Sequence, residues 1–318
     1  MNKTHTAPQA DFFIPLYMNG LQGRMLVVPS RNKKTSQQIL IVYGQNSNLE
    51  YWQGLAYDLS TYGTVTIPDL PGFGGMESFY SVKEKPSIDS LADYLASLIK
   101  LRYKRKRIVL AGLSSGFTLI TRMLQKYPEL VNKVDLLFCV AGYAHHDDFK
   151  IKNFKKYVYK IGSSILGINS IAVLYKTFYV GTPLATIALL KKHGQTLESA
   201  GYSNDQIKEI MKLEKNRRML SDPRTAAKIQ GELLKLDNCQ QRISLAVWHV
   251  TGVSDELLDN RNVEQHLRII FKNYSSIKIK SAISTHNMTI DQPNSFNKVI
   301  PGKVRDLLRK NMNRSIYK

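Results

Sequence analysis

The feature of this sequence that most constrains its fold is a repeated alternation of short apolar runs with longer amphipathic ones. The runs QQILIVYG (37–44), TVTIPDLPG (64–72) and RIVLAGLS (107–114) are rich in β-branched residues and end in a turn, which is typical of buried strands. The stretches between them, 49–60 and 87–103, carry apolar residues at helical spacing, with Ser87 as a possible N-cap. Strands separated by helices predict a mostly parallel sheet that is covered on both faces.

The alternation is interrupted once along the chain. The stretch 11–30 predicts an antiparallel hairpin that leads into the sheet, and after a strand at 134–143 the sequence has helical patterns alone until about residue 240. A strand at 243–252, a helix at 256–271, a strand at 274–283 and a helix near 297–310 then complete the pattern. We therefore predict an α/β core in two parts, 1–143 and 241–318, and an inserted all-helical cap, 144–240.

Composition bounds the class of protein. Hydrophobic residues make up 43% of the chain and charged residues 22%, a balance that can bury a large core. The formal net charge of +20 has three explanations, namely a solvated basic surface, an anionic membrane or nucleic acid. We favour the solvated surface, with peripheral membrane contact second and nucleic acid last, because no nucleic-acid motif accompanies the basic residues.

The first residues of the sequence and its cysteines also bear on the class of protein. The opening MNKTHTAPQADFFIP lacks an apolar signal region, so we expect a cytoplasmic protein. Cys139 lies in an apolar run, and two cysteines suggest neither a disulfide framework nor a zinc site. We expect no metal and no cofactor.

The chemical centre of the sequence is GLSSG (112–116), which lies where an apolar strand meets a helix. A serine nucleophile at such a sharp turn needs small residues two positions before and after it, and Gly112 and Gly116 meet that need. Ser114 is then the nucleophile. The amide of Ser115, at the helix N-terminus, points toward developing negative charge.

A serine nucleophile needs a base and an orienting acid, and candidates for both follow in the chain. Asp255 comes just after the strand at 243–252, and His286 lies in a loop after the predicted strand at 274–283. Each has an ordinary alternative, since a loop histidine is often merely solvated and an aspartate after a strand often caps a helix. Asp147 or Asp148, soon after the strand at 134–143, is the alternative acid.

Together these segments resemble the α/β-hydrolase superfamily, in its cap-bearing branch of esterases, lipases and carbon-carbon bond hydrolases. The matching segments are IVYGQNSN, PDLPGFGGME, GLSSG, TGVSDELL and STHNMTIDQPNSF. The resemblance implies a Ser114, Asp255 and His286 triad and an oxyanion hole formed by the amides of Gln45 and Ser115. Tyr43 departs from the family, in which a histidine is common before the glycine. A serine nucleophile argues against the dehalogenases and epoxide hydrolases of this fold.

The substrate has to be inferred from the cap. The stretch 161–190 is apolar apart from Lys176 and a few small polar residues, so it predicts helices that line an acyl pocket, with an interfacial helix pair or a membrane span as alternatives. We therefore expect hydrolysis of an ester of a hydrophobic small molecule or lipid. Cleavage of a thioester or a carbon-carbon bond, or a silent member that binds ligand or membrane, remains open.

Overall fold

The computed structural model of the chain describes residues 12–150, 161–180, 182, 187, 190, 198, 203–252, 255, 257–279 and 300–316. These residues contain one eight-stranded sheet in the order β1-β2-β4-β3-β5-β6-β7-β8. The strands are β1 (Phe13–Met18), β2 (Leu21–Val28), β3 (Gln38–Val42), β4 (Thr64–Pro68), β5 (Ile108–Leu113), β6 (Val134–Val140), β7 (Ile243–Gly252) and β8 (Phe271–Ile279). The hairpin β1-β2 is antiparallel, β2 pairs antiparallel with β4, and the remaining neighbours pair in parallel.

The central strands are buried on both faces, as their continuous apolar runs require. All five residues of β3 are buried. Val42 pairs with Gly112, and Gly112 pairs with Cys139, so β3, β5 and β6 end at the same edge of the sheet. Residues just beyond these ends are therefore brought together.

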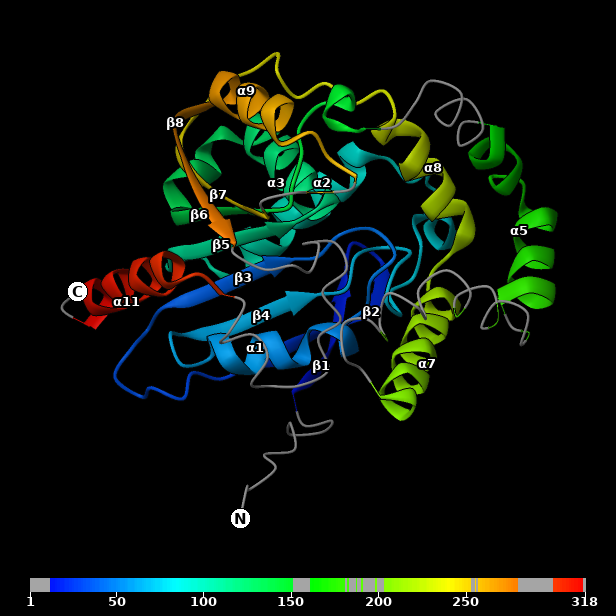
Figure 1. Cartoon of the computed structure of the whole chain (residues 1–318), viewed down its shortest axis with the longest axis horizontal. Coiled ribbons are helices and arrows are strands. Elements are labelled where there is room, and N and C mark those ends of the chain that lie inside the picture. Colours follow the sequence, from blue (N-terminus) through cyan, green and yellow to red (C-terminus); the bar gives the residue numbers. More distant parts are fainter. Residues whose placement is uncertain are drawn as a thin grey trace.

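Helices cover both faces of the sheet (Figure 1). They are α1 (Gln53–Leu59), α2 (Ile88–Arg102), α3 (Ser115–Lys126), α9 (Asn260–Ile270) and α11 (Gly302–Ile316), with short 3₁₀ turns η1 (Glu50–Trp52), η2 (Phe79–Val82), η3 (Pro128–Lys133) and η4 (His146–Asp148). Connections between parallel strands are right-handed crossovers. The connection from β3 to β4 runs toward the β1 edge of the sheet and places α1 on one face. The connections that contain α2, α3 and α9 run toward the β8 edge and place these helices on the other face. The Ser87 hydroxyl caps α2 by accepting the amide of Ser90 at 2.9 Å, as predicted.

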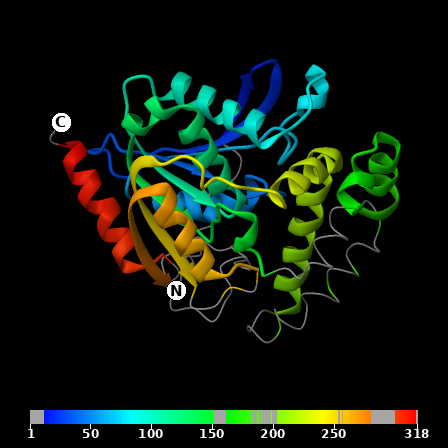
Figure 2. The same ribbon diagram turned by 90° about the horizontal axis from the view of Figure 1, so that it is seen from above.

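The insertion between β6 and β7 contains α5 (Asn169–Tyr175), the π-helical turn η5 (Lys176–Val180), α7 (Asn204–Leu220) and α8 (Pro223–Leu233). Figures 1 and 2 place these helices at the end of the molecule opposite α11, with α5 outermost. At the base of the insertion the outgoing and returning chains pair through an antiparallel bridge between His145 and Asp237. Within the described parts of the chain, no helix is long and apolar enough to cross a membrane.

The structure corrects two element boundaries near the acid segment. The helix predicted from residue 256 begins at Asn260, because the Asp259 side chain accepts the amides of Arg261 and Asn262 and so caps it there. The following strand begins at Phe271, which pairs with Ile243, three residues earlier than predicted. The predicted end of that strand lies outside the described residues.

Candidate active site

The turn between β5 and α3 holds Ser114 in a strained backbone conformation, with φ 52° and ψ −126°. The two flanking glycines are explained by close approach. A Cβ on Gly112 would lie 2.4 Å from the Cα of Phe117, and one on Gly116 would lie 2.2 Å from the carbonyl oxygen of Val42. Any larger residue would push the helix off the sheet, so this is the geometry expected of a nucleophile elbow.

The turn after β3 lies directly beside Ser114. A Cβ on Gly44 would come within 3.1 Å of the Ser114 Cβ. The backbone amide of Gln45 donates to the Ser115 Oγ at 2.6 Å, and Ser115 is only 5% exposed. The sequence did not indicate this bond, because it depends on the rotamer of Ser115. It means that one proposed oxyanion donor is already engaged by a neighbouring hydroxyl.

Tyr43, the departure from the family pattern, is completely buried and has a defined role in this chain. Its hydroxyl donates to Asp69 Oδ1 at 2.7 Å and accepts the Leu70 amide at 3.1 Å, while Arg24 Nε donates to Asp69 Oδ2 at 2.9 Å. Burial raises the pKa of Asp69 to about 8, against the opposing hydrogen bond from Tyr43 and the charge of Arg24. The network ties the PDLPGFGG loop to the end of β3.

Asp255 follows β7 and is 3% exposed. Its Oδ1 accepts the amides of Leu257 at 2.9 Å and Leu258 at 3.0 Å, and its carbonyl oxygen accepts Lys150 Nζ at 2.9 Å. Asp259, not Asp255, caps α9, so the helix-cap alternative for Asp255 is wrong. The predicted base, His286, lies outside the described residues.

The alternative acids have other partners. Asp148 is fully buried, and its Oδ2 accepts the amides of Ala144 at 2.8 Å and His145 at 2.9 Å while its Oδ1 lies 2.6 Å from His266 Nδ1. The Asp147 side chain is 58% exposed and lies close to His145. Burial, followed by the nearby charges of His146 and His266, lowers the pKa of His145. Asp148 is therefore paired with His266, and the Asp147 carboxylate lies at the surface.

Helix α8 joins the insertion to the loops around the elbow. The Asp222 amide donates to the Gly72 carbonyl at 2.8 Å, and the Gln45 side-chain amide donates to the Ala226 carbonyl at 2.6 Å. Farther along, the Ile88 amide donates to Glu232 Oε2 at 2.7 Å. Gln45 therefore contacts Ser115 through its backbone and the insertion through its side chain.

The comparisons with known proteins agree with this arrangement. Residues 38–155, which span β3 to the start of the insertion, match the protein family described as the alpha/beta hydrolase fold. The chain has the α/β-hydrolase fold. No curated protein matches the sequence.

Solved structures share the α/β-hydrolase fold over almost the whole chain. An esterase from Thermogutta terrifontis has 16% identity and a TM-score of 0.63, covering 94% of this chain and 99% of its own. An enol-lactonase from Burkholderia xenovorans has 12% identity and a TM-score of 0.60, covering 96% and 100%. A membrane phospholipase A has 15% identity and a TM-score of 0.63, covering 95% and 86%. At these identities the likeness establishes the fold alone.

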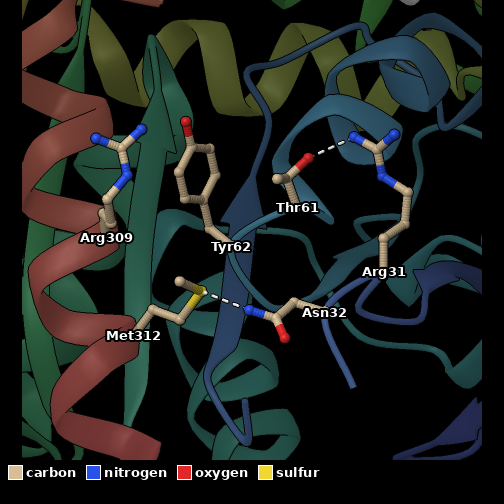
Figure 3. Close-up of a pocket in the computed structure, with 6 residues that line it drawn as sticks. All are labelled: Arg31, Asn32, Thr61, Tyr62, Arg309 and Met312. Atoms are coloured by element: carbon tan, nitrogen blue, oxygen red, sulfur yellow. Dashed lines mark hydrogen bonds between the residues drawn. The ribbon is translucent and has the colours of Figure 1, made fainter. Parts of the chain in front are cut away.

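The described part of the chain contains a cavity of about 470 Å³ that is lined by Arg31, Asn32, Thr61, Tyr62, Arg309 and Met312 (Figure 3). Asn32 Nδ2 donates to Met312 Sδ at 3.5 Å across it, and Arg31 donates to Thr61. Thr61 and Tyr62 directly precede β4, whereas Ser114 follows β5. The cavity therefore lies at the opposite edge of the sheet from the nucleophile.

Proposed function

We propose that this α/β-hydrolase is a serine hydrolase that transfers an acyl group to water from an ester of a hydrophobic small molecule or lipid. Ser114 is the nucleophile, His286 the base and Asp255 the acid that orients it. The amides of Gln45 and Ser115 hold the oxyanion. The observation that carries the proposal is the strained conformation of Ser114 between Gly112 and Gly116.

In the proposed reaction, Ser114 Oγ attacks the substrate carbonyl while His286 takes its proton. The tetrahedral oxyanion collapses, the ester C–O bond breaks, and His286 returns the proton to the departing alcohol. Water then attacks the acyl-enzyme, again with His286 as base, and releases the carboxylic acid and Ser114. Asp255 stabilises the imidazolium that forms twice in this cycle.

The hydrophobic acyl group is inferred from the sequence, in which 161–190 is apolar apart from Lys176 and a few small polar residues. Helix α8 of the insertion contacts Gln45, so the insertion reaches the proposed oxyanion hole. Two similar structures are named as an esterase and a membrane phospholipase A, which fits an ester substrate. The same triad could cleave a thioester or a carbon-carbon bond in a different pocket, which is the second candidate reaction.

The test is covalent labelling by a fluorophosphonate probe, with nitrophenyl esters of increasing chain length assayed in parallel. Wild type should label and turn over, and Ser114→Ala and His286→Ala should lose both by at least about a thousandfold in rate. Ser81→Ala, which changes an exposed hydroxyl in η2, serves as the matched control and should label as wild type does.

A folded wild type that neither labels nor hydrolyses any ester would overturn the serine hydrolase. If labelling is present but thioesters or carbon-carbon substrates are turned over faster, the mechanism stands and the substrate class changes. Ligand binding without any turnover would instead identify a silent member of the superfamily.

We also propose that an anionic membrane surface is a peripheral partner. Nine large apolar side chains of the insertion are exposed by 37–68%: Ile161, Ile165, Ile168, Val173, Leu174, Phe178, Tyr179, Ile187 and Leu190. In sequence this apolar stretch is flanked by KIKNFKKYVYK and by Lys191 and Lys192, and the chain carries a net charge of +20. Apolar groups flanked by cations suit the boundary between lipid tails and anionic headgroups.

Co-sedimentation with vesicles tests this partner. Binding to vesicles that contain an anionic phospholipid should exceed binding to neutral ones, should fall as salt rises, and should persist in Ser114→Ala. Phe178→Ser should weaken it severalfold, whereas Tyr17→Ser, which changes a side chain 72% exposed on β1, outside the insertion, should not. Equal binding to neutral and anionic vesicles, or equal loss in both variants, would exclude the proposed surface.

A further inference from the structure

A cluster of imidazoles and carboxylates lies at the base of the insertion, outside the proposed triad. His145 and His146 enter it from the segment after β6, and His266 enters it from α9. The ring centroid of His145 lies 4.1 Å from that of His146 and 4.4 Å from that of His266. Asp147 adds a carboxylate at the solvent side. Nothing in the proposed ester hydrolysis uses these groups.

Three of these residues have the spacing of metal ligands. One ligand atom each from His145, His146 and Asp147 lies within 4.8 Å of the others. His146 Nε2 is 3.4 Å from Asp147 Oδ1, and His145 Nδ1 is 3.7 Å from Asp147 Oδ2. In a tetrahedral zinc site, bonds of roughly 2.0–2.2 Å place the donor atoms about 3.4 Å apart. Each of the two separations is close to that length, and they end on different oxygens of the Asp147 carboxylate, so small side-chain rotations are needed to bring three donor atoms around one ion.

Hydrogen bonds to the other atoms orient the two rings. His146 Nδ1 lies 3.0 Å from the Leu236 carbonyl oxygen, which requires a proton on Nδ1 and leaves Nε2 as the atom that faces the carboxylate. His145 Nδ1 accepts the Asp147 amide at 3.2 Å, so it carries no proton. Two ring nitrogens and a carboxylate thus converge, an arrangement that a cation stabilises.

We propose that His145, His146 and Asp147 bind a divalent cation of the zinc class, with water completing its coordination. Two imidazoles and one carboxylate are a donor set that suits zinc and its neighbours better than magnesium or calcium. Coordination through His145 Nδ1 replaces the 3.2 Å bond from the Asp147 amide. Since His145 pairs with Asp237 and His146 with Leu236, the bound ion stiffens the base of the insertion.

Isothermal titration of the full, untagged chain with zinc chloride tests the site. We expect about one equivalent bound at micromolar or tighter affinity, at least tenfold weaker in both His146→Gln and Asp147→Asn. Asp135→Asn, which removes a carboxylate that pairs with Arg107 outside the cluster, should bind as wild type does. Ser114→Ala should also be unchanged, so the result is independent of the proposed hydrolase chemistry.

A thermal melt with and without zinc gives a second measurement. Zinc should raise the melting temperature of wild type, and magnesium at the same concentration should not. Both variants should lose the zinc-dependent shift while they melt at the wild-type temperature without metal. Zinc affinity that is the same in wild type, His146→Gln and Asp147→Asn, or no zinc binding at all, would overturn the proposed metal site.

Discussion

Ser115 presents two groups at the same point of the site. Its backbone amide is a proposed oxyanion donor, while its hydroxyl accepts the Gln45 amide at 2.6 Å, which is the other proposed donor. A single well-placed donor is worth roughly a hundredfold or more in rate, so a hydroxyl that competes for it lowers transition-state stabilisation.

The first prediction concerns this competition. Ser115→Ala should raise kcat for nitrophenyl ester hydrolysis by about threefold to tenfold, because the Gln45 amide becomes available to the oxyanion. Ser115→Thr keeps the hydroxyl and should not show the gain. A fall in kcat for Ser115→Ala at unchanged stability would mean that the hydroxyl orders the loop instead.

The second prediction concerns the elbow. Gly116→Ala should lower the free energy of unfolding by about 3 kcal/mol or more, because the new Cβ would lie 2.2 Å from the backbone oxygen of Val42. Gly162, whose Cβ would meet nothing within 4 Å, provides the control, and Gly162→Ala in this helical stretch should leave the free energy of unfolding unchanged or raise it by up to about 1 kcal/mol. Urea denaturation measures both, and equal midpoints would contradict the packing argument.

Among the elements, α8 links the insertion to the core loops through the hydrogen bonds of Asp222, Ala226 and Glu232 described above. Its N-cap, Asp222, accepts the Arg224 amide at 3.0 Å and the Thr225 hydroxyl at 3.1 Å, and Pro223 occupies the first turn. Proline directly after a capping residue is typical of helix beginnings.

The third prediction follows from that cap. Asp222→Ala should lower the free energy of unfolding by about 1 kcal/mol, because the first turn loses its acceptor. Asp205→Ala removes a carboxylate whose side chain is 92% exposed beside Lys208, and it should cost less than about 0.5 kcal/mol. A loss of equal size in the two variants would indicate a general charge effect rather than a cap.

The sequence predicted elements well where one strong signal marked each boundary. Ser87 marked the start of α2, and the strand predicted at 243–252 has the bounds of β7. The prediction was wrong at the start of β8, because Lys272 and Asn273 belong to that strand but are polar and carry no strand signal in the sequence. The bonds of Ser115 and Tyr43 were out of reach, since a sequence does not encode rotamers and long-range partners in any local pattern.

On the scale of the whole molecule, the sheet buries a titratable group. His249 of β7 is 1% exposed, and its Nδ1 lies 3.0 Å from the Tyr274 hydroxyl. Burial lowers the pKa of His249 to about 4, although the charges of Glu264 and Asp255 oppose the shift. The unfolded chain, with a pKa of about 6.5, therefore binds a proton at this residue first as the pH falls.

The fourth prediction is an acid sensitivity of the fold. The buried, neutral His249 contributes to the free energy of unfolding, and this contribution is fully present above about pH 6.5. It is lost progressively as the pH falls toward 4, by about 3 kcal/mol in all. Thermal melts of wild type between pH 7 and pH 4.5 should show this decline. His249→Asn, which cannot titrate, should show a shallower one even if it is less stable at pH 7, and parallel curves would exclude His249 as the cause.

The bridge between His145 and Asp237 holds the two ends of the insertion side by side. The chain leaves the core and returns to it at one place, so the ninety or so residues between can diverge, lengthen or be exchanged in evolution without separating β6 from β7. New substrate preferences can then arise by replacement of a peripheral module, while the strand ends that carry the chemistry are inherited unaltered.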